Sequence, residues 1–150
     1  MANILLAVTG SISAYKAADI TSQLTKLGHQ VKVLMTPAAT AFITPLTLQV
    51  LSKNPVGLDV MIEEDPQRIE HIDIGKETDL FLVAPASANT IAKLAMGLAD
   101  NMVTSTALAL PQGTKKLLAP AMNTKMLEHP ATQRNLKLLQ DYGYQIIQPR

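Results

Sequence analysis

The turn that follows the first apolar run carries the residue types that bind phosphate. Thr9-Gly10-Ser11-Ile12-Ser13 lies between the apolar run 4–8 and a segment with helical periodicity. A helix N-terminus presents free N–H groups and a partial positive charge, which suits an anion. Gly10 lets the backbone approach a ligand, and two serines add hydroxyl donors. The segment matches neither the dinucleotide-binding fingerprint nor the P-loop, and serine is also a common helix cap. The turn alone therefore favours a phosphate site and a plain cap equally.

Two more turns have the same character. Ala-Pro-Ala-Ser-Ala-Asn-Thr at 84–90 and Ala-Pro-Ala-Met-Asn at 119–123 each follow an apolar run. Ser87, Asn89 and Thr90 could donate to a mononucleotide, and Asn123 could bind a carboxylate or a flavin carbonyl. Each of these polar residues could equally be a helix cap.

The sequence has three histidines. His71 lies between Ile69 and Ile72 with acidic neighbours, where its pKa could be tuned for proton transfer. A lone histidine is more often structural, and His29 and His129 are expected to be exposed. No histidine pair has metal-ligand spacing and the chain has no cysteine, so we expect no metal site and no disulfide.

Periodicity predicts the elements that position these turns. Apolar runs predict strands at 4–8, 31–35, 79–84, 116–119 and 144–147, with Pro85 and Pro120 closing the third and fourth. Helical patterns lie at 13–27, 37–42, 45–51, 69–76, 88–97, 101–110 and from 122 or 123 to 141, with a break near Pro130. The segment 52–67 is expected to be loop with one short strand. Alternating strands and helices predict an α/β fold with a mainly parallel sheet, which binds ligands beyond the carboxyl ends of its strands.

Composition narrows the class of protein. The 150 residues suit a single domain over 1–150, and a net charge of +1 with 3% aromatic residues argues against nucleic acid. No apolar stretch is long enough to span a membrane, and no secretory signal is visible. These features predict a cytoplasmic protein without a membrane or nucleic-acid partner.

Three blocks resemble a known family. Gly10-Ser11-Ile12, Pro-Ala-Ser-Ala-Asn-Thr at 85–90 and Pro-Ala-Met-Asn-x-x-Met at 120–126, with a histidine between them, are similar to the homo-oligomeric flavin-containing cysteine decarboxylases. The likeness extends over 1–150 and is greatest to bacterial members of coenzyme A synthesis. Leu127 departs from the pattern, because the family usually has tryptophan there.

This resemblance implies a flavodoxin-like, Rossmann-like three-layer fold that binds FMN. The flavin would oxidise the thiol of a cysteine moiety to a thioaldehyde, carbon dioxide would leave, and the enethiol would then be reduced. The implied partners are a phosphorylated small-molecule substrate and further copies of the chain, in a trimer or a multiple of trimers. The implied residues are His71 for catalysis, Asn123 and Met122 for substrate, and Gly10, Ser11, Ile12, Thr36, Phe42, Ser87, Ala88, Asn89, Thr90 and Ala121 for FMN.

Three other functions stay open. They are a peptidyl-cysteine decarboxylase that modifies a lantibiotic peptide, a flavin prenyltransferase, and a flavodoxin-like electron carrier. A prenyltransferase usually has Gly-Ala-Ser-Gly in its first turn, and carriers tend to be acidic and to stack aromatic residues on the flavin. The family also carries a cysteine on a mobile clamp, which we expect to follow Arg150 in the native protein.

Overall fold

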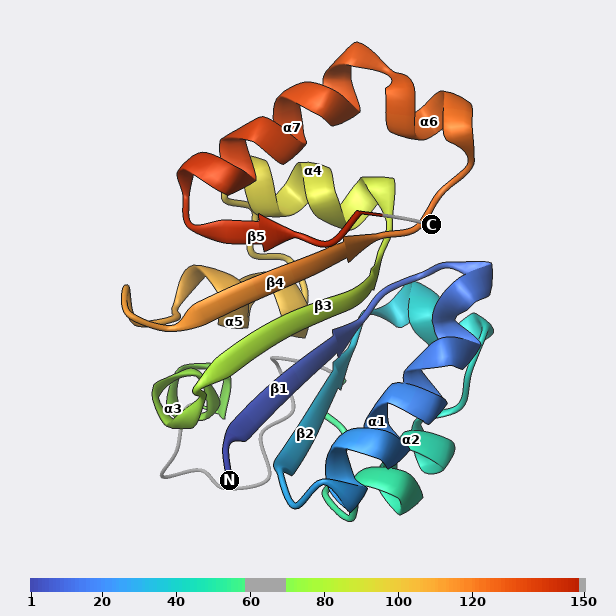
Figure 1. Ribbon diagram of the computed structural model, residues 1–150, viewed down its shortest axis with the longest axis vertical. Helices are drawn as coiled ribbons and strands as arrows, with labels where there is room; N and C mark the ends of the chain where they lie inside the picture. The colour runs from blue at the N-terminus through green and yellow to red at the C-terminus, as the bar shows by residue number, and fades with distance from the viewer. Residues whose placement is uncertain (59–69, 149–150) are drawn as a thin grey trace.

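The computed structural model describes residues 1–58 and 70–148, and a five-stranded parallel sheet is its centre (Figure 1). The strands are β1 (Asn3–Val8), β2 (Gln30–Met35), β3 (Leu80–Ala86), β4 (Lys115–Pro120) and β5 (Tyr144–Ile146). Their spatial order is β2-β1-β3-β4-β5, and each neighbouring pair is parallel. This is the flavodoxin-like order, in which the strand order reverses between β1 and β3.

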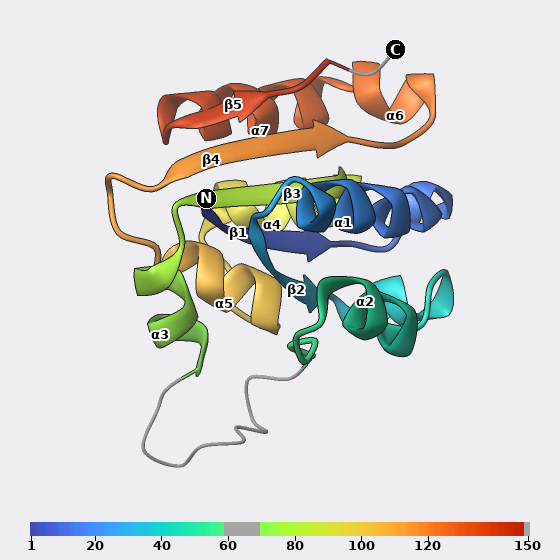
Figure 2. The ribbon, with the colours of Figure 1, turned by 60° about the horizontal axis from the view of Figure 1, so that its bottom comes forward.

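Helices cover both faces of the sheet, as Figure 2 shows. The short η1 (Ile12–Tyr15) leads into α1 (Lys16–Lys26), which packs with α2 (Pro45–Ser52) on one face. The other face carries α3 (Glu70–Glu77), α4 (Ala88–Met96), α5 (Met102–Leu108) and α7 (Pro130–Asp141). The remaining elements, η2 (Pro37–Ala41) and α6 (Thr124–Glu128), follow β2 and β4.

Each face of the sheet has its own apolar core. Successive strand residues point to opposite faces, so Leu6 and Val8 pack toward α1 while Leu5 and Ala7 pack toward α4 and α5. All four side chains are buried. The continuous apolar runs of the sequence reflect this two-sided burial.

The predicted elements are confirmed with small changes of boundary. The pattern at 13–27 begins as the η1 turn before α1, and Gly28 follows it with a φ of +92°. Residues 59–67 of the predicted loop lie outside the described residues. Gly57, just before them, forms an isolated bridge to Leu34.

The expectation that Pro85 closes its strand is wrong, whereas Pro120 is the last residue of its strand, as expected. β3 continues to Ala86 and β4 includes Pro120, and Ala86 pairs with Pro120. The register shifts between Val83 and Ala86, and such an irregularity is where a strand tolerates a residue without an N–H donor.

None of the described helices is long and apolar enough to cross a membrane.

Candidate active site at the carboxyl edge of the sheet

Thr9 joins the two turns at the point where the strand order reverses. Its side chain is fully buried, and its hydroxyl donates to the carbonyl oxygen of Pro85 at 2.6 Å. The same hydroxyl accepts a hydrogen bond from the backbone N–H of Ser87 at 2.8 Å. The turn after β1 and the turn after β3 are therefore held together.

Each of the first four strands is followed by a polar residue that caps the next helix. The side chains of Ser11, Thr36, Ser87 and Asn123 accept from the backbone N–H of Ser13, Ala39, Thr90 and Met126, respectively. The capping interpretation is thus confirmed for Ser11, Ser87 and Asn123, and the cap at Thr36 is a further finding of the structure. Capping leaves the hydroxyl protons and the amide group of Asn123 as donors, because only an oxygen of each side chain is used for capping.

Backbone donors add to this set. The N–H groups of Ile12, Ala88 and Asn89 belong to the first residues of η1 and α4 and have no acceptor within those helices. A donor-rich edge with two helix starts has the chemistry of a phosphate site. Phe42 and the side chain of Ile12 are exposed beside this edge, Thr90 is buried, and Ala121 and Met122 are half-buried.

Gly10 has a packing role that its sequence position does not reveal. A Cβ atom at Gly10 would lie 2.6 Å from the Cβ of Ala38 in η2. The absent side chain therefore lets the turn after β1 pack against the turn after β2. Gly10 thus allows two protein segments to pack closely, and this role is separate from letting the backbone approach a ligand.

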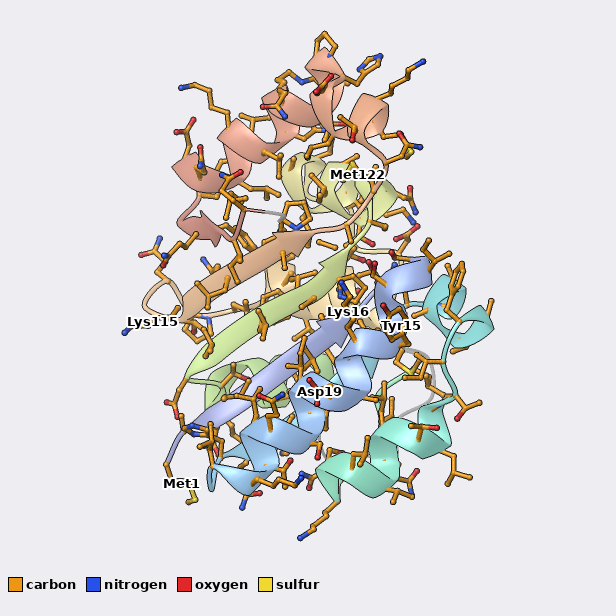
Figure 3. All side chains as sticks on the ribbon, turned by 45° about the vertical axis from the view of Figure 1, so that its right-hand side comes forward. Met1, Tyr15, Lys16, Asp19, Lys115 and Met122 are labelled. Carbon is orange, nitrogen blue, oxygen red and sulfur yellow. The ribbon has the colours of Figure 1, made fainter. Side chains whose placement is uncertain are left out.

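A pocket of about 300 Å³ opens beside these turns, on the α1 face of the sheet. Its lining comes from η1, the first half of α1, the carboxyl ends of β3 and β4 and the two residues after β4: Ser13, Lys16, Ile20, Ala84, Pro85, Ala119, Pro120, Ala121 and Met122. Figure 3 shows Lys16 at the start of α1 and Met122 beyond the end of β4. Sequence reasoning missed Lys16, although residues 13, 16 and 20 have the spacing of one helix face.

His71 is not brought to these turns within one chain. It is the second residue of α3, and its side chain lies outside the described part of the structure. The end of α3 lies at the amino ends of the strands, away from the carboxyl edge that carries the turns. Glu77 pairs there with Lys32 of β2 at 3.3 Å, and Gly75 lies near Leu110. The predicted catalytic residue and the predicted FMN turns thus come from different regions of the fold.

The other two histidines have local structural contacts. His129 is exposed, as expected, and its Nδ1 accepts from the N–H of Ala131 at the start of α7. His29 is half-buried rather than exposed, because its Nδ1 accepts from the N–H of Ala2. The described residues contain no group of three or more acidic or histidine side chains that could hold a metal ion.

Residues 1–150 match the Flavoprotein family model over their whole length. The chain belongs to the Flavoprotein family. This Flavoprotein member is 67% identical over 147 residues to a probable phosphopantothenoylcysteine decarboxylase of Streptococcus mutans, covering 98% of the chain and 82% of that relative. It is 48% identical to a coenzyme A biosynthesis bifunctional protein of Bacillus subtilis, of which it covers 36%.

Solved structures of decarboxylases have the same fold as this Flavoprotein member. The FMN-dependent cysteine decarboxylase SpaF superposes with a TM-score of 0.92 at 31% identity, covering 100% of this chain and 85% of that one. A PPC decarboxylase mutant in complex with pantothenoylaminoethenethiol gives 0.88 at 29% identity, covering 99% and 82%. The peptidyl-cysteine decarboxylase EpiD gives 0.84 at 30% identity, covering 99% and 87%.

Proposed function

We propose that this chain is an FMN-dependent phosphopantothenoylcysteine decarboxylase of coenzyme A biosynthesis. It removes the carboxylate from the cysteine moiety of 4'-phospho-N-pantothenoylcysteine and releases 4'-phosphopantetheine. The observation that carries this function is the 67% identity to the streptococcal enzyme along nearly the whole chain. The 48% identity to the coenzyme A biosynthesis protein of Bacillus subtilis also favours the small-molecule substrate.

The donor set of the carboxyl edge fits FMN. The hydroxyls of Ser11 and Ser87 and the free N–H groups of Ile12, Ala88 and Asn89 suit its phosphate. Gly10, Thr36, Phe42, Thr90 and Ala121, which follow the same strands, complete the set of residues that we propose for FMN. The chemistry that FMN supplies when bound is reversible two-electron transfer with the carbon that bears the substrate's sulfur.

The chain's own residues bind the substrate and move its protons. The amide group of Asn123, which capping leaves free to donate, would hold the substrate's carboxylate, with Met122 beside it. His71 would take a proton from the substrate as its thiol becomes a thiocarbonyl. Carbon dioxide then leaves from the carbon next to that thiocarbonyl, because the sulfur accepts the electron pair of the broken bond.

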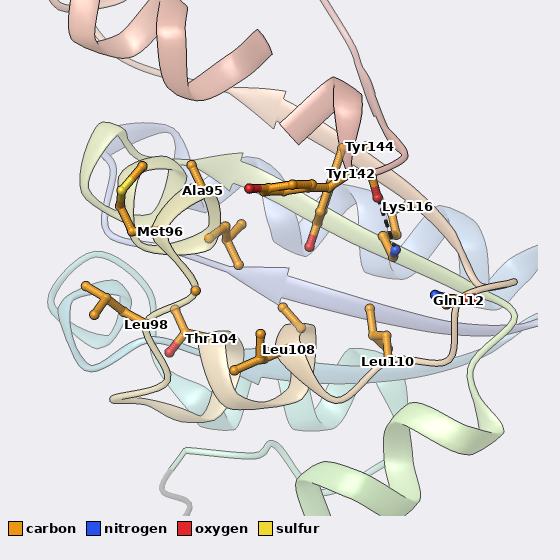
Figure 4. A pocket seen from close by; sticks show the side chains of 13 residues that line it. Ala95, Met96, Leu98, Thr104, Leu108, Leu110, Gln112, Lys116, Tyr142 and Tyr144 are labelled. Carbon is orange, nitrogen blue, oxygen red and sulfur yellow. Dashed lines mark hydrogen bonds between the residues drawn. The ribbon is translucent and has the colours of Figure 1, made fainter. Parts of the chain in front are cut away.

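A homo-oligomer, as a trimer or a multiple of trimers, is part of the proposal. The separation of α3 from the FMN turns supports a site in which a neighbouring copy supplies His71. A pocket of about 390 Å³ lies between α4, α5 and the end of α7, and its lining includes the exposed apolar side chains of Met96, Leu98 and Leu108 (Figure 4). Exposed apolar patches of this kind are typical of protein interfaces. The single domain over 1–150 and the cytoplasmic location stay predictions.

The decisive experiment is turnover of 4'-phospho-N-pantothenoylcysteine by the purified protein, followed by mass spectrometry of the product. We expect a yellow protein with stoichiometric FMN and a product that has lost carbon dioxide. A colourless protein that gains no thermal stability from added FMN would contradict the cofactor. Turnover of a cysteine-terminated peptide instead would favour the peptidyl-cysteine decarboxylase.

A further inference from the structure

The pocket between α4, α5 and the end of α7 is separate from the candidate active site. It lies on the α5 face of the sheet, whereas the pocket beside the turns lies on the α1 face. It is lined by Lys116 near the start of β4, while the turns follow the other ends of the strands. Its volume of about 390 Å³ is within the range that small-molecule sites usually have.

The wall of this pocket is mostly apolar, and its free polar groups are gathered at one end. Figure 4 shows Lys116 and Gln112 toward that end and Met96 and Leu98 toward the other. Small-molecule sites commonly combine an apolar wall with a few polar groups that fix orientation. The apolar lining comes from α4, α5 and the residues that follow them: Leu94, Ala95, Met96, Leu98, Ala107, Leu108 and Leu110.

Tyr144 gives the pocket a buried hydroxyl group without a partner. The residue is only 8% exposed, and its hydroxyl forms no hydrogen bond with the residues that the structure describes. Burial raises the pKa of Tyr144 above its usual range, so the hydroxyl keeps its proton at neutral pH. Buried polar groups are nearly always hydrogen-bonded in proteins. This hydroxyl is therefore available to donate to an acceptor on a ligand.

Lys116 adds an ammonium group beside the same ring. Its Nζ lies 5.6 Å from the centroid of the Tyr144 ring and donates to the carbonyl oxygen of Tyr142 at 3.5 Å. The two ion pairs found among the described residues involve Lys32 and Lys93 instead. None of the described residues that line the pocket is acidic. The ammonium thus keeps further donors and a charge that no carboxylate of the pocket neutralises.

We propose that this pocket is a second binding site, which takes a carboxylate with an apolar body, such as a medium-chain fatty acid. The two carboxylate oxygens would accept from the Lys116 ammonium and the Tyr144 hydroxyl. The apolar body would lie along the wall toward Met96 and Leu98. The inference does not depend on the proposed function, because it uses neither the flavin nor the substrate. It is compatible with a neighbouring copy on the rim, since Tyr144 is buried while Met96 and Leu98 are exposed.

The test is calorimetric titration of the FMN-loaded protein with octanoate, and octan-1-ol is the uncharged control. Octan-1-ol should bind about tenfold more weakly or less, because it cannot form a charged hydrogen bond with Lys116. Lys116→Gln should weaken octanoate binding by about tenfold or more, for the same reason. Tyr144→Phe keeps the ring and removes one neutral donor, so it should weaken binding by about threefold or more. Lys115→Gln is the matched control, because the adjacent Lys115 does not line the pocket, and it should leave binding unchanged.

Four results would overturn the proposal. They are no octanoate binding by the wild type, equal binding of octanoate and octan-1-ol, unchanged octanoate binding by Lys116→Gln, and loss of octanoate binding in Asn123→Asp, which would locate the ligand in the candidate active site. If Lys116→Gln does not fold, Tyr144→Phe and the octan-1-ol control still decide the outcome. A wild-type protein that binds octanoate but does not turn over 4'-phospho-N-pantothenoylcysteine would contradict the proposed function alone.

Discussion

The hydroxyl of Thr9 accepts a hydrogen bond from the backbone N–H of Ser87 at 2.8 Å, and this contact links the two turns on either side of the strand reversal. Thr9 follows β1 and Ser87 follows β3, 78 residues apart in sequence. The carbonyl oxygen of Pro85 accepts the hydroxyl proton at 2.6 Å. Both proposed phosphate-binding turns therefore depend on one buried threonine.

Replacing Thr9 with valine should weaken folding and FMN binding together. The substitution keeps the shape but leaves the partly buried N–H of Ser87 without its acceptor, which costs about 1–3 kcal/mol. Urea unfolding should show a lower midpoint with an unchanged slope. The matched control is Thr21→Val, because Thr21 is also fully buried but donates only to Ala17 within α1. Equal FMN affinity in Thr9→Val and Thr21→Val would contradict the role of Thr9.

Gly10→Ala should destabilise the protein through a clash with Ala38. The added Cβ would lie 2.6 Å from the Cβ of Ala38, and overpacking of this kind costs about 1–3 kcal/mol. The double variant Gly10→Ala with Ala38→Gly should recover much of the loss in thermal unfolding. Gly113→Ala is the control, because nothing lies within 4 Å of the position of its added Cβ. A Gly10→Ala protein as stable as this control would refute the packing role.

Asn123→Asp should separate the capping role of Asn123 from its proposed substrate role. Aspartate caps a helix about as well as asparagine, so the free energy of unfolding should change by less than about 0.5 kcal/mol. The new negative charge and the lost amide donor should raise the substrate KM by about tenfold or more. Asn123→Ser keeps a capping oxygen without adding charge, so its KM should lie between those of Asn123→Asp and wild type. A near-normal KM in Asn123→Asp would remove the proposed role.

His71→Asn should keep FMN and lose decarboxylation, because it removes a proton-transfer group without adding bulk. Carbon dioxide release and flavin absorbance measure the two effects. A normal rate of release would exclude His71 as the proton-transfer residue.

If neighbouring copies share a site, two inactive variants should complement each other. Coexpression of His71→Asn with Asn123→Asp should restore activity in mixed oligomers, since some sites then combine an intact His71 with an intact Asn123 from different chains. Activity no greater than the sum of the separate variants would place both residues in one chain.

Light scattering of the wild type should give a trimer or a multiple of trimers, and a monomer that still binds flavin would contradict the assembly.

The elements and the site residues were predictable from the sequence to different extents. Apolar runs and helical spacing predict the five strands of the described sheet and their neighbouring helices, because burial on both faces of a parallel sheet leaves a strong pattern. The polar residues after β1, β3 and β4 stand out against aliphatic neighbours. The sequence left open whether these residues cap helices or bind a ligand. The structure uses one oxygen of each side chain for capping and leaves a donor free, so the two interpretations are compatible.

Only the tertiary structure determined which of these residues meet. Strand order brings Thr9 to Ser87 and Gly10 to Ala38, and no local pattern encodes such pairs because their partners are distant in sequence. Strand order also places Lys16 beside the carboxyl ends of β3 and β4, and the packing of α3 separates His71 from the FMN turns. Local residue types thus determine which elements form and where donors occur. The long-range packing of the sheet determines which donors share a site.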